Sequence, residues 1–163
     1  MASIATLGSH CALQVLKGAK DEGFKTVLIC EKKRERLYRR FKFIDKLILV
    51  DSFLEVSESK CESLLKENNS ILIPHGTLIA QMKQEQIESI QTPIFGNKHI
   101  LGWESDRLLK EQLMKEAKFD LPKSISSPKE IESLVIAKRH GAAGGKGYFL
   151  ASTEDEYNKK RDM

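Results

Sequence analysis

The residues best suited to chemistry lie in a glycine- and lysine-rich stretch. Its candidate ligand-binding residues are Lys138, Gly144, Gly145, Lys146 and Gly147. Glycine lets the backbone approach phosphate oxygens with its N–H groups turned inward, and lysine supplies countercharge. Apolar runs at 134–137 and 148–151 flank the stretch, which predicts a β-hairpin whose tip folds over an anion. The sequence therefore predicts a nucleotide-phosphate loop.

The spacing of the glycines narrows the kind of loop. A P-loop needs a glycine five residues before Gly145 and a hydroxyl after Lys146, but His140 and Gly147 stand there. A dinucleotide fingerprint needs a helix after its glycines, whereas 148–151 has the pattern of a strand. A strand-loop-strand flap is the arrangement that ATP-grasp ligases place over ATP. The alternative is a Gly-rich hairpin with ordinary surface lysines.

Two short segments after predicted strands could bind a sugar or a phosphate. They consist of Gly8, Ser9 and His10 after the first strand, and His75, Gly76 and Thr77 after the fourth. Each pairs a glycine for close backbone approach with hydroxyl and imidazole groups that can hydrogen-bond a ligand. Either segment alone would suit a tight turn with Ser9 as a helix N-cap. Two alike at equivalent strand ends favour a binding site.

The elements that would position these residues form two domains. Apolar runs predict strands at 4–7, 26–30, 46–50, 70–74 and 93–95, and helical spacing predicts helices at 11–22, 57–68 and 78–90. Strands that are apolar on both faces indicate a parallel sheet covered by helices. We therefore expect residues 1–97 to form a Rossmann-like α/β domain that binds substrate.

Residues 98–163 have a different pattern and predict the beginning of a second domain. The expected elements are a helix over 103–119, a short helix from Pro128, the hairpin, and a helix over 153–160. Thr153 is the expected N-cap of the last helix, and Glu156 would complete a capping box. Because the chain stops at Met163 directly after this signal, we expect the second domain to be incomplete.

Composition restricts the class of protein. The 163 residues are 40% hydrophobic and 31% charged, as in soluble globular proteins, and no apolar run reaches the length of a membrane span. The three cysteines lack metal or disulfide spacing, and none of the four histidines forms a helical pair. This spacing predicts no metal ligands within the chain. The start of the sequence does not have the pattern of a signal peptide, so the expected location is the cytoplasm.

A basic run from Lys32 to Lys42 contributes much of the net charge of +4. The simplest interpretation is a solvated surface. The second is that one or two of its arginines hold the phosphate of a small nucleotide, because arginine matches phosphate oxygens with paired donors. Nucleic-acid binding, with Tyr38 and Phe41 stacking on bases, ranks third.

Several segments together resemble the formaminoimidazole-carboxamide ribonucleotide synthetases, a formate-dependent family of ATP-grasp ligases known chiefly from archaea. The resemblance extends along nearly the whole chain. It rests on residues 4–10, 16–24, 38–42, 74–76, 95–97 and 103–105 and on the flap. It implies a Rossmann-like pre-ATP-grasp domain followed by the start of an ATP-grasp domain. Position by position, His10 matches the family's substrate-contacting histidine, and Thr77 stands where the family often has a substrate-contacting serine.

The implied reaction joins formate to the amine of aminoimidazole-carboxamide ribonucleotide with ATP, releasing ADP and phosphate, in IMP biosynthesis. The implied partners are this ribonucleotide, formate and ATP. Neither nucleic acid nor a membrane is implied, and whether the full-length enzyme forms a homo-oligomer is an open question. Lys138 and Lys146 would serve the phosphates of ATP. The family's magnesium ligands lie in later sequence, so we expect this chain to be an N-terminal fragment that is inactive alone.

Two other functions remain open. One is a related ATP-grasp carboxylate-amine ligase with another acid or amine. The other is a catalytically dead nucleotide-binding module, which would result if the chain truly ended at Met163 without magnesium ligands.

Overall fold

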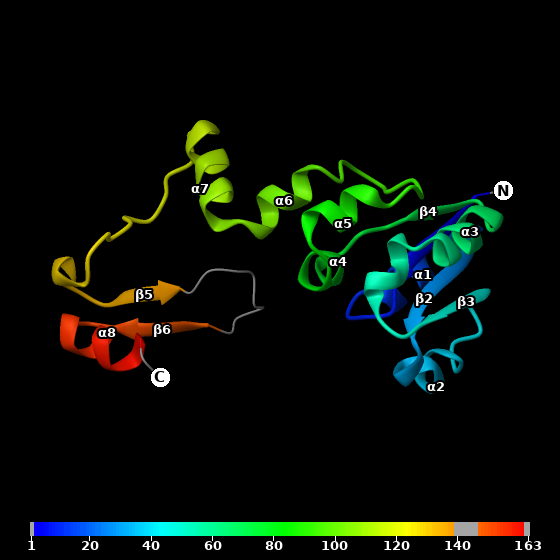
Figure 1. Ribbon diagram of the computed structural model, residues 1–163, viewed down its shortest axis with the longest axis horizontal. Helices are drawn as coiled ribbons and strands as arrows, with labels where there is room; N and C mark the ends of the chain where they lie inside the picture. The colour runs from blue at the N-terminus through cyan, green and yellow to red at the C-terminus, as the bar shows by residue number, and fades with distance from the viewer. Residues whose placement is uncertain (1, 139–146, 162–163) are drawn as a thin grey trace. The chain divides into compact units, whose positions relative to one another are not determined.

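The computed structural model describes residues 2–138 and 147–161, and it divides into two compact units, Met1–Gly102 and Trp103–Met163 (Figure 1). The expected domain boundary lay after residue 97, five residues before this division. The difference arises because residues 98–102 pack with the first unit. Leu101 lies against its core, and the backbone carbonyl of Lys98 accepts a hydrogen bond from Gln84.

The first unit is built on a parallel sheet. Its strands are β1 (Ser3–Leu7), β2 (Lys25–Glu31), β3 (Lys46–Val50) and β4 (Ser70–Leu72), in the order β3-β2-β1-β4. All three strand pairs are parallel. The predicted α/β class is therefore confirmed, and the order reverses direction between β1 and β4. Such a switch point is where open α/β sheets bind ligands.

Helices cover both faces of this sheet. One face carries α1 (Ala12–Asp21) and α2 (Glu35–Tyr38), which pack around Leu16, Leu28 and Tyr38. The other face carries α3 (Ser59–Glu67), α4 (Gly76–Gln81) and α5 (Gln84–Ser89), with 3₁₀ turns at Phe53–Ser57 on this face and at Lys32–Arg34 before α2. Leu28 and Ile29 are neighbours in β2, and they are buried in the cores on opposite faces of the sheet, as the pattern of apolar residues on both faces predicted.

Two predicted elements of the first unit differ from the structure. The helix expected over 78–90 is divided into α4 and α5, because Met82 has an extended backbone and its buried side chain joins the core. The Gln86 side chain then accepts a hydrogen bond from the backbone N–H of Lys83 at 3.0 Å, where α5 begins. The strand expected at 93–95 is reduced to a single parallel bridge between Leu72 and Ile94.

The second unit contains a hairpin and a helix packed on it. Its strands β5 (Val135–Lys138) and β6 (Tyr148–Ala151) pair antiparallel, as predicted, and α8 (Glu154–Arg161) packs on β6. The rings of Phe149 and Tyr157 join them, with centroids 5.4 Å apart. Thr153 is the N-cap of α8, as expected, because its Oγ1 accepts the backbone N–H of Glu156 at 3.2 Å.

The helix expected over 103–119 is two helices, α6 (Ile100–Ser105) and α7 (Arg107–Glu116). Asp106 separates them, since its Oδ1 accepts the backbone N–H groups of Leu108 at 2.8 Å and Leu109 at 3.2 Å. An aspartate with this geometry satisfies the first N–H groups of a new helix. The helix expected from Pro128 is one 3₁₀ turn, Pro128–Glu130.

Candidate functional site

The two segments predicted to bind a ligand lie side by side in the first unit. Gly8, Ser9 and His10 follow β1, and His75, Gly76 and Thr77 follow β4 at its carboxyl end. Since β1 and β4 are parallel neighbours with Ser3 opposite Ser70 and Ala5 opposite Leu72, both segments leave the same edge of the sheet. The sheet thus brings together two sequence segments that are more than sixty residues apart.

Three side chains of these segments form a hydrogen-bonded row. The hydroxyl of Thr77 donates to Ser9 Oγ at 2.6 Å, and Ser9 Oγ lies 3.0 Å from Nδ1 of His10. Thr77 is buried, Ser9 is half-buried and His10 is exposed, so the row leads from the interior to the surface. His10 therefore presents a ring supported from behind by two hydroxyl groups.

The other histidine of the site, His75, joins the two segments. Its Nε2 lies 3.0 Å from the backbone carbonyl of Leu7, and its Nδ1 accepts the backbone N–H of Thr77 at 3.3 Å. The second bond makes His75 the N-cap of α4. Both ring nitrogens are engaged within the chain, which fixes the position of Thr77 relative to the end of β1. The adjacent Gly76 has open space where a side chain would begin.

The backbone of Gly8 lies against two residues of the basic run. Arg34 Nη1 donates to the carbonyl of Gly8 at 3.2 Å, and the Tyr38 hydroxyl donates to the carbonyl of Ser9 at 3.5 Å. Burial raises the pKa of Tyr38, and the positive charge of Arg34 partly offsets this. Gly8 itself donates its N–H to the carbonyl of Ile29 at 2.7 Å.

Sequence reasoning did not assign Arg34 and Tyr38 to the site. The feature of the sequence that could have indicated them is the basic run itself, for which one interpretation was that an arginine holds a nucleotide phosphate. Much of the rest of the run forms surface ion pairs, for example Lys32 with Asp51 at 2.7 Å and Arg39 with Glu35 at 2.6 Å. Exposed pairs of this kind contribute little to stability, which fits the solvated-surface interpretation for most of the run.

The predicted flap is only partly within the described residues. Lys138 is exposed at the end of β5 and pairs with Tyr148 across the hairpin. Gly147 has a φ of +78°, in the left-handed region that favours glycine. The other candidate residues of the flap, Gly144, Gly145 and Lys146, lie outside the described residues.

The face of the hairpin that carries Lys138 is apolar. By strand alternation Lys138 shares it with Ile136, and across the pair with Tyr148 and Leu150. These three side chains are 58%, 55% and 42% exposed. Exposed apolar side chains beside an ammonium group offer contacts to an aromatic base and countercharge to phosphates.

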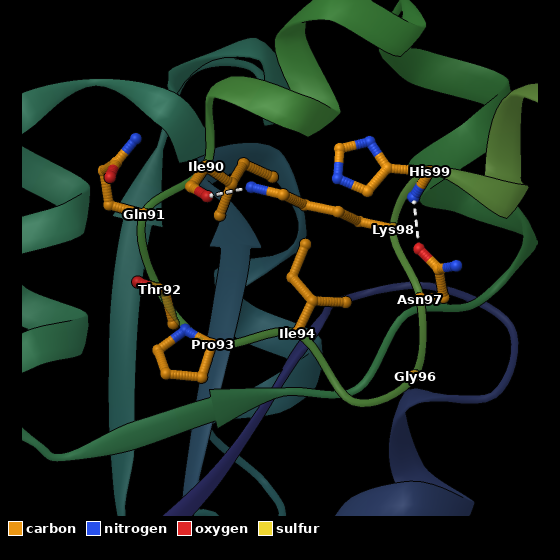
Figure 2. A pocket seen from close by; sticks show the side chains of 9 residues that line it. All are labelled: Ile90, Gln91, Thr92, Pro93, Ile94, Gly96, Asn97, Lys98 and His99. Carbon is orange, nitrogen blue, oxygen red and sulfur yellow. Dashed lines mark hydrogen bonds between the residues drawn. The ribbon is translucent and has the colours of Figure 1, made fainter.

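A separate hollow of about 270 Å³ is lined by residues 90–94 and 96–99 of the first unit (Figure 2). Figure 2 shows the Lys98 side chain reaching the carbonyl of Ile90, at 3.0 Å, and Lys98 also donates to the carbonyl of Glu88 at 2.6 Å. The backbone N–H of His99 donates to Asn97 Oδ1. The Lys98 ammonium is thus occupied in holding this segment against the end of α5.

A larger hollow, of about 710 Å³, lies at the opposite edge of the sheet from the Ser9 and Thr77 hydroxyls. Its lining includes Ala2, Asn69 and Ser70, at the amino ends of β1 and β4. Ligands of open α/β sheets bind at the carboxyl ends, so the row formed by Thr77, Ser9 and His10 is the better candidate.

The described part of the chain contains no group of three or more His, Cys, Asp or Glu side chains that could hold a metal ion. Among the same residues, none of the helices has the length and apolar character needed to cross a bilayer.

Comparisons with known proteins indicate the family of this chain. Residues 4–125 match the profile of a family described as "Protein of unknown function (DUF1246)". The 5-formaminoimidazole-4-carboxamide-1-(beta)-D-ribofuranosyl 5'-monophosphate synthetase of Nitrosopumilus maritimus is 68% identical over 163 residues, which are 100% of this chain and 48% of that protein. The chain spans about half the length of the curated relatives it matches.

Solved structures resemble this chain over less than half of their own length. The IMP biosynthesis protein PurP from Thermococcus kodakaraensis superposes with a TM-score of 0.70 and 25% identity, over 90% of this chain and 48% of that one. The N5-carboxyaminoimidazole synthetase from Staphylococcus aureus, solved with ADP, superposes with a TM-score of 0.72 over 99% of this chain and 44% of that one. At 16% identity, the second likeness shows the fold alone. Because the family profile covers most of its residues, this chain belongs to the DUF1246 family.

Proposed function

We propose that this chain is the ribonucleotide-binding portion of a ligase that joins formate to the amine of aminoimidazole-carboxamide ribonucleotide with ATP, releasing ADP and phosphate. The observation that carries the proposal is the row of Thr77, Ser9 and His10 at the carboxyl ends of two adjacent parallel strands. The synthetase names of its relatives support the reaction.

In this proposal the first unit holds the imidazole ribonucleotide. His10 is exposed and supported from behind, so its ring can bond a ligand without first being ordered. Arg34 has donors beyond the one that bonds Gly8, and a guanidinium group suits a phosphate or a sugar oxygen. His75 and Gly76 would form the wall of the site, His75 by positioning Thr77 and Gly76 by leaving room beside the backbone.

The hairpin of the second unit would bind ATP. The ammonium of Lys138 would meet the phosphates, the apolar face around Ile136 would meet the adenine, and Gly144, Gly145, Lys146 and Gly147 would form the covering loop. Phosphoryl transfer to formate gives formyl phosphate, whose carbonyl the amine can attack. Catalysis of this kind depends on positioning and on neutralising the phosphate charge while water is kept out.

Magnesium would neutralise part of that charge. Among the described residues there is no group of three or more His, Cys, Asp or Glu side chains, and the relatives are about twice as long as this chain. We therefore assign the metal ligands to the part of the enzyme beyond this chain, and we expect the 163 residues alone to produce no ADP from ATP, formate and the ribonucleotide. The described residues contribute binding and orientation.

The test is steady-state kinetics of the full-length enzyme with His10→Ala. Losing a hydrogen bond worth about 1 to 3 kcal/mol should raise the KM for the ribonucleotide roughly tenfold or more, with little change in the KM for ATP. His99→Ala is the matched control, because His99 is exposed and pairs only with Glu88 and Asn97 in the described part of the chain. Equal effects of His10→Ala on both constants would contradict the proposal.

A further inference from the structure

The hollow of about 710 Å³ at the amino ends of β1 and β4 has no part in the proposed function. Its volume lies within the range of about 300 to 1,000 Å³ that is typical of small-molecule sites. Residues 59, 62, 63 and 66 of α3 line it, and their spacing places them on one face of that helix. The beginning of β4 and residues 91–93 supply much of the remaining lining. We call this site the α3 hollow.

The backbone of Ser70, at the beginning of β4, faces away from β1. The N–H of Ser3 donates to the carbonyl of Asn69 at 3.0 Å, and the N–H of Ile73 donates to the carbonyl of Ala5 at 2.8 Å. Every second residue from Asn69 onward therefore bonds β1, because alternate residues of a parallel strand bond alternate neighbours. The N–H and the carbonyl of Ser70 consequently point to the outer edge of β4.

This outer edge is paired at Leu72 but not at Ser70. The N–H of Leu72 donates to the carbonyl of Pro93 at 2.8 Å, and its carbonyl accepts the N–H of Phe95 at 2.9 Å. The equivalent bond to the Ser70 carbonyl would come from the nitrogen of Pro93, which carries no hydrogen. None of the described residues donates to this carbonyl, although Ser70 is only 4% exposed and lines the hollow. A buried carbonyl of this kind favours a bound group that has an N–H or O–H.

The charges of the lining favour a ligand with one negative charge. Glu62 and Lys66 are the ionised side chains that line the hollow. The carboxylate of Glu62 already accepts the backbone N–H of Gln91 at 2.8 Å, and it accepts both the N–H and the hydroxyl of Thr92. Lys66 is exposed, and no carboxylate in the described part of the chain pairs with it. Its ammonium can therefore serve as the countercharge of an anion.

We propose that the α3 hollow is a second binding site, which takes a small apolar carboxylate that also carries an N–H or O–H donor. The carboxylate would meet Lys66, and the donor would meet the carbonyl of Ser70. The apolar body would lie against Ile71, which is half-buried, and Pro93, which is exposed. Because this hollow is at the opposite edge of the sheet from His10, the inference does not depend on the proposed function.

Three probes of similar size test the chemistry of the ligand. Indole-3-acetate has a carboxylate, a ring N–H and an apolar body, naphthalene-1-acetate lacks the N–H, and indole-3-acetamide lacks the charge. Calorimetric titration of the full-length enzyme should give a Kd of about 1 mM or tighter for indole-3-acetate, as expected for a ligand of this size. The other two probes should bind about three- to tenfold more weakly. Absence of binding, or equal affinity for all three probes, would overturn the inference.

Three variants of α3 test where the probe binds. Lys66→Met should remove the preference for indole-3-acetate over indole-3-acetamide. Lys60→Met is the matched control, because Lys60 is exposed on the same helix and does not line the hollow. Ser63→Trp places a large ring in the hollow from an exposed position, so it should weaken binding more than about tenfold without lowering the Tm. If Lys66→Met behaves like Lys60→Met, or if Ser63→Trp binds the probe as the wild type does, the inference is wrong.

A competition experiment separates this site from the one that contains His10. The affinity for indole-3-acetate should stay within about twofold of its value when the ribonucleotide and ATP are present at saturation, and also in His10→Ala. Displacement of the probe by the ribonucleotide would show that the probe binds the other site, and it would overturn the inference. If the enzyme does not bind the ribonucleotide but the probes and variants behave as expected, the proposed function fails and the second site stands.

Discussion

The Cε2 atom of Tyr38 lies 3.0 Å from the position that a Cβ atom on Gly8 would occupy, and the carbonyl oxygen of Ile29 lies 3.3 Å from it. The ring of Tyr38 is buried, and the Ile29 carbonyl is fixed by its bond to the N–H of Gly8. Neither neighbour can move away easily. Gly8 is therefore required because the basic run packs directly against the turn after β1.

Gly8→Ala should destabilise the first unit by about 1 to 3 kcal/mol, because the new methyl group overpacks a fixed site. Gly18→Ala is the matched control. Gly18 lies within α1 and has nothing within 4 Å of an added Cβ, so this change should stabilise by about 0.5 to 1 kcal/mol. Urea denaturation of both variants measures the difference. Equal stabilities of Gly8→Ala and the wild type would show that the Tyr38 ring moves aside freely.

The cysteines should differ sharply in reactivity. Burial raises the pKa of Cys61 to about 12 and that of Cys30 to about 11, whereas Cys11 is exposed. Since the thiolate is the reacting form, iodoacetamide at pH about 8 should add one alkyl group to the native chain, at Cys11, and three after denaturation. Mass spectrometry with peptide mapping identifies the site. Cys11→Ser should leave the native chain unlabelled, and rapid native labelling of Cys30 would contradict the prediction.

Much of the sheet could be predicted because its residues face two cores. Leu28 and Ile29 are buried on opposite faces, and such runs leave few alternatives to a central parallel strand. The breaks in the helices could not be predicted in the same way. At Met82 the helical spacing of the sequence continues, but the backbone is extended and the side chain is buried in the core. At Asp106 a capping residue was present within a segment that otherwise has helical spacing.

The candidate site was predictable in part. Ser9 and Thr77 each follow an apolar run, which indicated that both lie at strand ends. Their direct contact requires β1 and β4 to be neighbours in the sheet, and this order was not evident from the sequence. The approach of Arg34 and Tyr38 to this turn depends on the path of the chain after β2. Charge and aromatic content mark that run without indicating which residues turn inward.

A pH-dependent prediction concerns Asp45, which closes the loop before β3. Its Oδ2 accepts the backbone N–H of Thr26 at 2.9 Å, and its Oδ1 accepts from Lys20 at 2.7 Å. Burial acts to raise the pKa of Asp45, but the hydrogen bonds from Lys20 and Thr26 outweigh it and lower the pKa below the ordinary carboxyl value. A carboxyl with a lowered pKa in the folded state stabilises above its unfolded-state pKa and loses this as the pH falls through the folded-state value.

Asp45→Asn should therefore be about 1 to 2 kcal/mol less stable than the wild type at neutral pH, and the difference should shrink below a pH of about 4. Urea denaturation at the two pH values measures it. Asp21→Asn is the control, because Asp21 is 58% exposed in its pair with Lys17 and should contribute only about 0.5 kcal/mol. A difference between Asp45→Asn and the wild type that stays constant with pH would contradict an ionic role.

The last prediction tests the hairpin as an ATP site. Lys138 is exposed on the hairpin face that also carries Ile136 and Leu150. In the full-length enzyme, Lys138→Met keeps the length of the side chain and removes its charge, so kcat/KM for ATP should fall roughly tenfold to a hundredfold, as expected for a charged hydrogen bond to phosphate. The Tm should stay unchanged, since little apolar surface is lost.

Two further variants serve as controls. Lys138→Arg should retain more activity than Lys138→Met. Lys129→Met, at an exposed position of the 3₁₀ turn, should retain full activity. Turnover of Lys138→Met equal to that of the wild type would show that this lysine serves only as a surface residue of β5, and the assignment of ATP to the hairpin would be wrong.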